Sequence, residues 1–492
     1  MEATEATSAP GDARREPRPA EVRGNRWTDI DVEEIGALTA SATVSVVISG
    51  RGGPEELALT LASLTAQTYP AKLTEVLVER STAAKASTAP RPGNAPPNPV
   101  GSADEAGGEV ILLVEAGAIL DPRLVEAHAR WHHAVSDAVS IGPERAVDAA
   151  GITAEEVEGA ARSDRLDALL GPRRAPGEAE LAIEAYLERT RQLTERDPDL
   201  FWIASCGTVA VRRAIWAAAG GRSREPDDRL ARLDLAWRLA QAGTVLVPEH
   251  AAVSHTTFRR LPLVPRGLLG EGGGGAGVPR AESLIPSPGY RRGGGPRRHR
   301  RPSMVVEIFA REEPSGEVLE TVDDVLRGRF SDLELRLALP DSHPERPLVA
   351  AAVEHDPRVT LVDEKENESE NRTEEVPLRV TLPLVAHPDE RTFEDLNVLM
   401  REEEVGALHV TVPGEVPRNA MVEVVATGAL ARARRVAEVN GDPPEVVLGE
   451  LFGERWISGV EVSLRRRGAA EPQVTEHGPL APATDLEHER TQ

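Results

Sequence analysis

The sequence predicts an α/β protein in which a mostly parallel sheet is flanked by helices, followed by a second α/β domain. Apolar, β-branched runs alternate with segments that carry apolar residues at helical spacing, an order typical of parallel sheets. A stretch rich in Gly, Pro and Arg then interrupts the chain, and the strand–helix–strand order begins again after it. The chain has 492 residues, enough for more than one domain of about 100–200 residues.

The first unit opens with a strand, a helix and a second strand. Residues 44–48 form an apolar, β-branched run that suits a strand buried on both faces. In the segment 54–70, Pro54 takes the first helical position, leucines recur at helical spacing, and Pro70 ends the pattern. Residues 74–80 predict the second strand. These elements form a βαβ unit, so the two strands are expected to be parallel.

The rest of this unit continues the alternation of strands and helices. The elements are predicted in order as a strand, two helical regions, a strand with a short helix, an amphipathic helix and a last strand: residues 111–114, 122–135, 151–195, 201–221, 227–243 and 244–255. The first of these strands ends in the loop Glu115, Ala116 and Gly117. Two adjacent histidines on the following helix, His132 and His133, point in different directions, so packing or surface roles are expected for them.

The second unit repeats the order of the first. Residues 303–310 predict a strand, 316–330 a helix and 332–340 a strand, which indicates a weak internal duplication. Residues 406–435 again predict a strand, a Pro/Gly loop and a helix. The resulting division is a disordered tail, a first domain, a flexible linker, a second domain and a second disordered tail: residues 1–25, 26–261, 262–303, 304–467 and 468–492.

The composition disfavours several classes of protein. The formal net charge is -24, and nucleic-acid binding needs clustered Lys and Arg, so nucleic acid is not expected as a partner. The single cysteine, Cys206, excludes an internal disulfide and a zinc site built from cysteines. No apolar run approaches the ~20 residues that span a bilayer, and the N-terminus has no apolar signal segment. We therefore expect a cytoplasmic protein without a transmembrane segment.

Several sequence blocks occur together in the first unit. In order they are "VSVVISG", "PEELALTLASLTAQTYP", "GEVILLVEAG", "GTVAVRRAIWAAAGG", "LDLAWRLAQAG" and "VPEHAAVSH". In their order and spacing these blocks resemble family 2 glycosyltransferases over about residues 25–260, and in particular two-part actinobacterial members of that family. The resemblance implies a GT-A-like fold for the first domain and a second, degenerate GT-A-like domain after it.

The resemblance also implies a kind of chemistry. A nucleotide-sugar donor carries a diphosphate whose negative charge grows as the bond to the sugar breaks, so a divalent metal or cationic groups must stabilise it. The acceptor hydroxyl is a poor nucleophile, so an Asp or Glu must take its proton. Each role can be carried over, residue by residue, to this sequence.

The donor-binding candidates are Ser49, Arg51, Glu79 and Glu115. Ser49 and Arg51 lie in the loop after the first strand, where the family holds the nucleotide base, although a plain strand–helix turn remains equally open. Glu79 stands where the family has a base-binding Asp, and a surface ion pair is the alternative for it. Glu115 takes the place of the first Asp of the family's Asp-x-Asp motif and could accept hydrogen bonds from ribose hydroxyls.

The metal-binding candidates are Glu115 and His255. His255 takes the place of the family's terminal histidine ligand, whereas Gly117 stands where the family has its metal-ligating Asp. Hard cations such as Mg²⁺ and Mn²⁺ need several oxygen ligands. A divalent metal is therefore doubtful, because one imidazole and one displaced Glu make a poor site.

The candidate bases are Asp234 and Asp228, because the family's own base is missing. The family's Glu-Asp pair falls on Ala231 and Arg232, and an Arg cannot act as a general base at neutral pH. Asp234 stands beside the base position, and Asp228 lies three residues before Ala231, nearly one helical turn away.

Three functional hypotheses follow. By resemblance, the chain transfers a sugar from a nucleotide-diphosphate donor to a cell-envelope or secondary-metabolite acceptor, and changes at three motifs predict weak or lost activity. The alternative is a catalytically inactive pseudo-glycosyltransferase that binds a ligand or a partner. A third possibility is an interaction protein that contacts a protein partner through its second domain.

Overall fold

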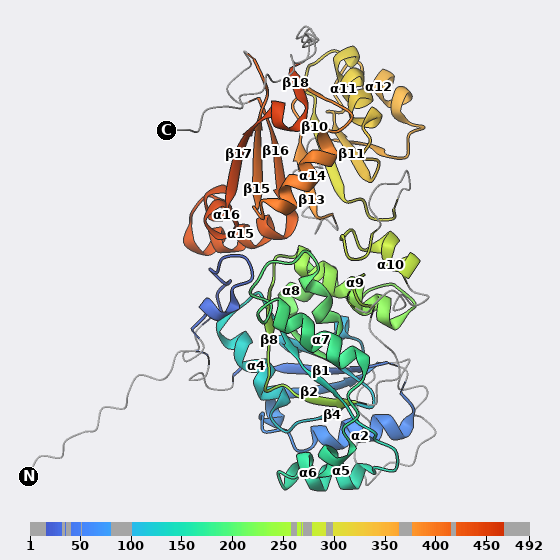
Figure 1. Cartoon of the computed structure of the whole chain (residues 1–492), viewed down its shortest axis with the longest axis vertical. Helices are drawn as coiled ribbons and strands as arrows, with labels where there is room; N and C mark the ends of the chain where they lie inside the picture. The colour runs from blue at the N-terminus through green and yellow to red at the C-terminus, as the bar shows by residue number, and fades with distance from the viewer. Residues whose placement is uncertain are drawn as a thin grey trace, which may run out of the picture.

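The computed structural model describes the two α/β units and part of the segment between them. The described residues are 16–31, 35, 41–50, 52–79, 101–256, 263–266, 268, 278–291, 299–363, 376–414 and 420–466. In Figure 1 the first unit lies at the bottom and the second at the top, each with helices packed around a sheet. The predicted α/β class, with a mostly parallel sheet flanked by helices, is confirmed.

The first unit contains a six-stranded sheet in the order β2-β1-β3-β7-β5-β8. In chain order its strands are β1 (Val44–Ser49), β2 (Thr74–Val78), β3 (Val110–Glu115), β5 (Ala138–Gly142), β7 (Thr208–Arg212) and β8 (Val245–Pro248). β1 pairs in parallel with β2 and β3, as the predicted βαβ unit requires, whereas β7 is antiparallel to both of its neighbours. A smaller sheet joins β4 (Ile119–Leu120), β9 (Ser254–Thr256) and β6 (Glu144–Ala146).

The helices of the first unit cover its sheets. They are α2 (Pro54–Leu64), α4 (Leu124–Ala134), α5 (Ala154–Arg162), α6 (Leu166–Leu170), α7 (Glu178–Arg189), α8 (Arg213–Ala218) and α9 (Asp228–Gln241). Short 3-10 helices are η1 (Trp27–Asp29), η2 (Ala71–Leu73), η3 (Ala103–Glu105), η4 (Gly171–Arg173) and η5 (Leu200–Ser205). Helix α2 begins at Pro54 as predicted, with Glu56 accepting from the backbone N–H of Gly53 at 2.6 Å.

Two local predictions differ from the structure. Helix α2 ends at Leu64, earlier than Pro70, and the hydroxyl of its C-cap residue Thr65 donates to the carbonyl of Ala62 at 2.8 Å. A 3-10 helix replaces the strand expected at the start of residues 201–221. Its aromatic residues Phe201 and Trp202 are buried in the core instead of pairing with a neighbouring strand.

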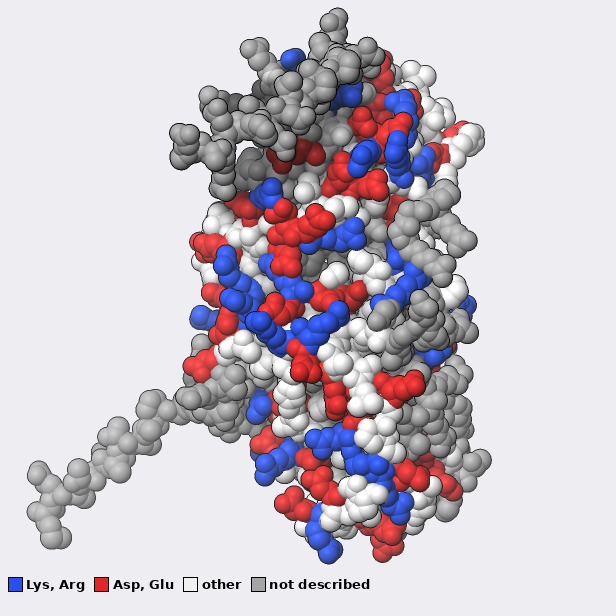
Figure 2. Space-filling view, viewed as in Figure 1, with Lys and Arg blue, Asp and Glu red and all other residues white. Residues whose placement is uncertain are grey.

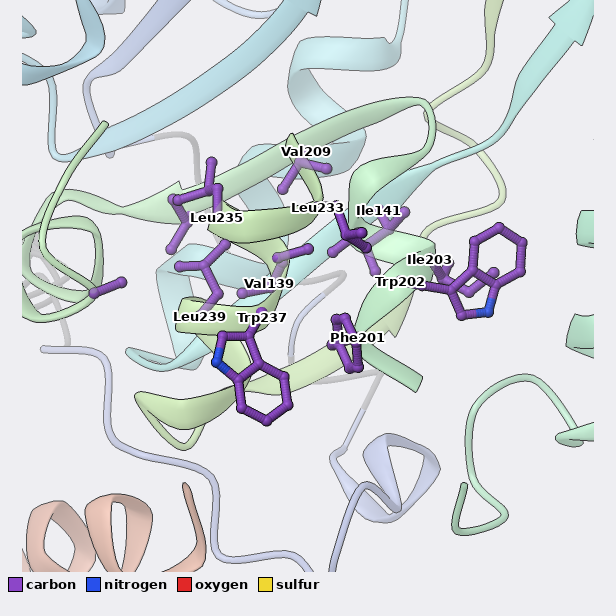
Figure 3. Close-up of a cluster of buried hydrophobic side chains, with 14 of the residues drawn as sticks. Val139, Ile141, Phe201, Trp202, Ile203, Val209, Leu233, Leu235, Trp237 and Leu239 are labelled. Atoms are coloured by element: carbon purple, nitrogen blue, oxygen red, sulfur yellow. The ribbon is translucent and has the colours of Figure 1, made fainter. Parts of the chain in front are cut away.

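The core between the sheet and α9 fixes the position of that helix. Figure 3 shows Phe201 and Trp237 side by side, with aliphatic side chains of β5, β7 and α9 around them. The two rings meet edge to face, with centroids 5.2 Å apart and planes at 82°. Leu233, Leu235 and Leu239 of α9 belong to the same buried cluster. Helix α9 is therefore held firmly against the strands that lead to the candidate site.

The second unit has a seven-stranded sheet in the order β12-β11-β10-β13-β16-β15-β17. Its strands are β10 (Met304–Phe309), β11 (Leu333–Ala338), β12 (Val359–Val362), β13 (Leu378–Thr381), β15 (Ala407–Thr411), β16 (Met421–Ala426) and β17 (Glu454–Ser458). From β11 onward, the order and strand directions repeat those of the first sheet, with β16 as the antiparallel member. The sequence did not predict β16, since it lies between the expected loop and helix of residues 406–435.

The remaining elements of the second unit pack around this sheet. The helices are α11 (Ser315–Arg327), α12 (Arg346–Val353), α14 (Thr392–Glu402), α15 (Thr427–Asn440), α16 (Pro444–Phe452) and the 3-10 helix η6 (Gly459–Val462). β14 (Ala386–Pro388) and β18 (Leu464–Arg466) form a separate antiparallel pair.

Parts of the predicted tail and linker are packed against the domains. The backbone N–H of Ala20 donates to Asp137 at 2.8 Å, and the Asn25 side chain donates to and accepts from the backbone of Leu246. In the predicted linker, α10 (Val278–Leu284) forms a short helix, and Arg301 is buried. These segments are ordered because their polar groups satisfy buried partners in the domains.

The two units meet where α9 ends and α15 begins. A Cβ atom on Gly428 would lie 2.6 Å from the carbonyl oxygen of Ala240, and one on Gly243 would lie 2.4 Å from that of Gly428. Only glycine permits such a close approach of two backbones. Arg432 of α15 is buried and donates to the carbonyls of Gly243 and Thr244, at 3.0 and 2.6 Å, and to that of Gly24.

Arg432→Ala is expected to lower the free energy of unfolding by about 2–3 kcal/mol, because buried carbonyls left without a donor cost about 1–3 kcal/mol each. Calorimetric unfolding measures the effect, and Arg434→Ala, at an exposed position of the same helix, is the matched control. Equal loss of stability in both variants would show that the contacts of Arg432 do not hold the domains together.

Candidate functional site

The candidate site lies where the strand order of the first sheet reverses. The chain passes from β1 to its neighbour β2, and then returns to β3 on the opposite side of β1. In open α/β sheets, ligands bind outside the carboxyl ends of the strands at such a point. Ser49 lies directly opposite Glu115 at the ends of β1 and β3, and the N–H of Glu79 donates to the carbonyl of Ile48 at 3.0 Å. Three predicted donor-binding residues therefore meet at one edge, whereas Arg51 lies outside the described residues.

The loops at this edge are closely packed around glycines. A Cβ atom on Gly52 would lie 2.7 Å from that of Ala116, so the loop after β1 rests directly on the loop after β3. Gly117 has a φ of +100°, and its N–H donates to the Thr60 hydroxyl at 2.9 Å. An Asp at position 117 would be strained in this conformation. Gly117 thus has a conformation that favours glycine, and it supplies no carboxylate at this edge.

Glu79 is buried and ion-paired. Its carboxylate lies 2.9 Å from the guanidinium of Arg222, which follows α8. Burial raises the pKa of Glu79 above its usual value, and Arg222 offsets only part of that effect. The charge of Asp228 also acts to raise this pKa, so the structure brings Glu79 and the predicted base Asp228 close to each other. Asp228 belongs to the first turn of α9, next to Asp227, which caps the helix.

Arg232 lies at the centre of a second charged cluster, formed with Glu115 and Glu144. Its guanidinium is 3.2 Å from the Glu115 carboxylate and also donates to the carbonyl of Gly207. Burial opposes the charge of Arg232, but Glu115 and Glu144 outweigh burial and raise its pKa. Arg232 thus pairs with Glu115, the carboxylate predicted on the donor side.

Glu144 was not singled out from the sequence. It begins β6, where its carboxylate accepts a hydrogen bond from the backbone N–H of Gly207. Burial and the nearby charge of Glu115 raise the pKa of Glu144 to about 7, against the opposing effect of Arg232. No local pattern in the sequence indicates this, because Glu144 joins the cluster only through the folding of β6 beside the segment that ends at Gly207.

Asp234, the other predicted base, is a buried structural anchor. Its two carboxylate oxygens bind Arg238 of the same helix at 3.1 Å and Arg301 of the predicted linker at 2.6 Å. Burial opposes ionisation of Asp234, but these two cations more than offset it and hold the pKa below its usual value. With both oxygens bound, Asp234 is poorly placed to accept a proton from an acceptor hydroxyl.

The structure places His255, the second predicted metal ligand, on the small sheet. It is buried in β9, and burial lowers its pKa to about 4, so its imidazole is neutral at pH 7. The charged groups that act on its pKa include Arg145 and Glu180, whereas Glu115 acts on Arg232 and Glu144. Within the described part of the chain, no group of three or more His, Cys, Asp or Glu side chains is arranged to hold a metal. The residues present do not fit a divalent cation at this edge.

A crevice of 1460 Å³ lies elsewhere, between the two units. Side chains of both domains line it, among them Trp237, Phe330 and Phe452. None of the predicted site residues that the structure describes lines this crevice. Over the residues that the structure describes, no helix is long and apolar enough to cross a membrane.

Comparisons with known proteins identify structural neighbours but no family. No family model matches the chain, and no curated protein matches it. Staphylococcus aureus TarS has 10% identity and a TM-score of 0.25, covering 32% of this chain and 35% of TarS. TarS residues 1–349 with UDP-GlcNAc give 8% identity and a TM-score of 0.23, covering 32% of this chain and 58% of that one.

A third neighbour is the mannosyltransferase PcManGT from Pyrobaculum calidifontis, in complex with GDP-Man and Mn²⁺. It has 12% identity and a TM-score of 0.28, and the match covers 46% of this chain and 64% of the mannosyltransferase. The match thus spans less than two thirds of each of these three proteins. All three TM-scores lie below 0.5, so membership of a glycosyltransferase family stays a prediction.

Proposed function

We propose that this chain is a glycosyltransferase-like protein that binds a nucleotide-diphosphate sugar at the carboxyl edge of β1, β2 and β3. The observation that carries the proposal is the convergence of Ser49, Glu79 and Glu115 at the point where the strand order reverses. By resemblance, the sugar would pass to a cell-envelope or secondary-metabolite acceptor. Weak or lost transfer is expected, and the alternative is an inactive protein that binds a ligand or a partner.

The ion pair between Glu115 and Arg232 favours that alternative. It places a guanidinium where the family has a carboxylate base and neutralises part of the remaining donor-side charge. Gly117 offers no metal ligand. Together these features support a site that has kept ligand recognition and lost much of its catalytic machinery.

The first domain is the one to which we assign the ligand. In the second sheet, the residues that follow β10, β11 and β13 are Ala310, Leu339 and Leu382, all apolar and fully buried. That edge offers no polar side chain to a nucleotide at these positions. A protein partner at the second domain remains a proposal. On the face shown in Figure 2, Lys and Arg are interspersed with Asp and Glu, without a continuous basic patch for nucleic acid.

Calorimetric titration with UDP, GDP and their common sugar conjugates tests the proposal. Micromolar binding is expected, and Mn²⁺ should change the dissociation constant less than twofold, because the residues at the edge do not fit a metal. Glu115→Ala should weaken binding by about tenfold, or ~1.4 kcal/mol, through loss of a charged hydrogen-bond acceptor. Glu158→Gln on the exposed surface of α5 is the matched control.

Two results would contradict this picture. Absence of binding to every nucleotide, with and without Mn²⁺, would refute the proposed function and redirect the search to protein partners. Binding that Mn²⁺ strengthens by tenfold or more would show that Glu115 and His255 do hold a metal when a nucleotide is present.

A further inference from the structure

Two charged side chains, Glu144 of β6 and Arg232 of α9, both bind the backbone of Gly207. Gly207 has a φ of +72°, and a Cβ atom on it would lie 2.3 Å from the carbonyl oxygen of Gly142. Only glycine can therefore bring this backbone so close to the segment that leads into β6. The N–H of Gly207 donates to Glu144, and its carbonyl accepts from Arg232. Gly207 thus holds Glu144 near Arg232, the residue that the resemblance aligns with the family's base.

We propose that Glu144 accepts the proton of the attacking hydroxyl in the sugar transfer of this domain. The inference rests on the proposed function, since it needs a bound nucleotide sugar. Helix α9 has no carboxylate at positions 231 and 232. Glu144 of β6 supplies one near the guanidinium of Arg232. The role differs from the sequence-based assignment, which placed the base at Asp228 or Asp234.

The position of Glu144 is fixed by the small sheet. Glu144 pairs with Ser254 in the β6–β9 ladder, and the N–H of Ser254 donates to the carbonyl of Pro143 at 3.0 Å. A side chain held by a strand is better oriented than one on a loop. Glu144 is only partly exposed, so it is shielded from bulk water while remaining accessible.

The charges around Glu144 suit a proton acceptor near neutral pH. Glu115 and Glu180 disfavour its ionised form, Arg232 favours it, and the balance with burial leaves the pKa at about 7. A general base is most effective when its pKa lies near the working pH. The other candidates are less suitable, since Asp234 is bound to two arginines and Asp228 lies beside Glu79.

The step balances without a further reactant. The oxygen of the acceptor hydroxyl forms a bond to the anomeric carbon of the donor sugar. The bond from that carbon to the diphosphate oxygen breaks, and its electron pair leaves with the nucleoside diphosphate. The hydroxyl proton passes to a carboxylate oxygen of Glu144. Water can replace the acceptor hydroxyl, and the products are then the free sugar and the nucleoside diphosphate.

Release of nucleoside diphosphate from the tightest-binding nucleotide sugar tests this role, with water and simple alcohols as acceptors. The rate of the full-length protein should rise with pH through about 7 and then level off, as Glu144 ionises. Glu144→Gln should lower the rate by about 10²-fold or more and remove this dependence, while the dissociation constant of UDP or GDP changes less than twofold. Glu144→Asp should restore part of the rate, and Glu158→Gln should leave it unchanged.

Different outcomes separate this inference from the proposed function. Nucleotide binding without any release above the rate in buffer would overturn the role of Glu144 and leave the donor site standing. A Glu144→Gln rate equal to that of the unaltered protein would also overturn the role. Failure to bind any nucleotide would overturn both.

Discussion

Asp234→Asn is expected to lower the free energy of unfolding by about 3–5 kcal/mol, because removing one partner of a buried ion pair leaves the other charge uncompensated. Asp234 binds Arg238 and Arg301, and all three side chains are buried. The substitution keeps the shape of the side chain but removes its charge. Two guanidinium groups would then remain buried without their carboxylate.

Denaturant unfolding followed by tryptophan fluorescence measures this loss of stability. Asp323→Asn, at an exposed position of α11, is the control and should change stability by less than about 0.5 kcal/mol. In a double-mutant cycle with Arg301→Gln, the two substitutions should be non-additive by about 1 kcal/mol or more. An Asp234→Asn protein of normal stability, with turnover abolished, would instead restore Asp234 as the base.

His128→Gln is expected to remove part of the loss of stability at acid pH. His128 is fully buried on α4, with its ring nitrogens 2.8 and 2.9 Å from the hydroxyls of Ser140 and Thr208. Burial lowers its pKa from 6.5 to about 3, since a charged imidazole there would lose its hydration. The folded protein therefore keeps His128 neutral where the unfolded chain would bind a proton.

Proton linkage determines whether His128 makes the folded state more or less stable as the pH falls. Between pH 6.5 and about 3, the unfolded state binds one more proton at His128 than the folded state does. Each unit of falling pH then removes up to about 1.4 kcal/mol of stability, and the loss between pH 6.5 and 4.5 sums to about 2.3 kcal/mol. Glu144 and Asp199 have raised pKa values in the folded protein, so over part of this pH range they make folding more favourable as the pH falls. The informative quantity is consequently the difference in slope between the protein and its His128→Gln variant.

Chemical unfolding at pH 4.5, 5.5, 6.5 and 7.5 gives that difference. The Glu144 and Asp199 contributions are common to both proteins and cancel. His355→Gln is the control, since the His355 side chain is 90% exposed and its replacement should leave the slope unchanged. Parallel stability curves for the unaltered protein and the His128→Gln variant would contradict a neutral, buried His128.

Local patterns were sufficient for most elements. The β-branched run of β1, the Pro54 start of α2 and the strand–helix–strand order of the second unit all appear as predicted. These features depend on residues close together in the chain, which hydrophobic periodicity and capping report well. The strand β16 was not predicted, because its short apolar run lies between a stretch that contains Pro and Gly and the start of α15, where the sequence predicts a loop and a helix.

The meeting of three donor-binding candidates at one edge could also be predicted, since each of them ends or directly follows a strand. Parallel pairing brings the carboxyl ends of β1, β2 and β3 to one edge, and with them Ser49, Glu79 and Glu115. The proton-accepting side could not be predicted in this way. Glu144 and Arg232 are far apart in sequence and come together only through Gly207.

The sequence by itself determined the two α/β units, their strand order up to the second strand of each, and the absence of carboxylates at positions 117, 231 and 232. The tertiary structure alone decided which charges compensate one another: Arg232 pairs with Glu115, and Arg301 with Asp234. The reason is physical. Secondary structure follows from short-range propensity and burial pattern, whereas an ion pair and the pKa of its members depend on which distant segments fold against each other and exclude water.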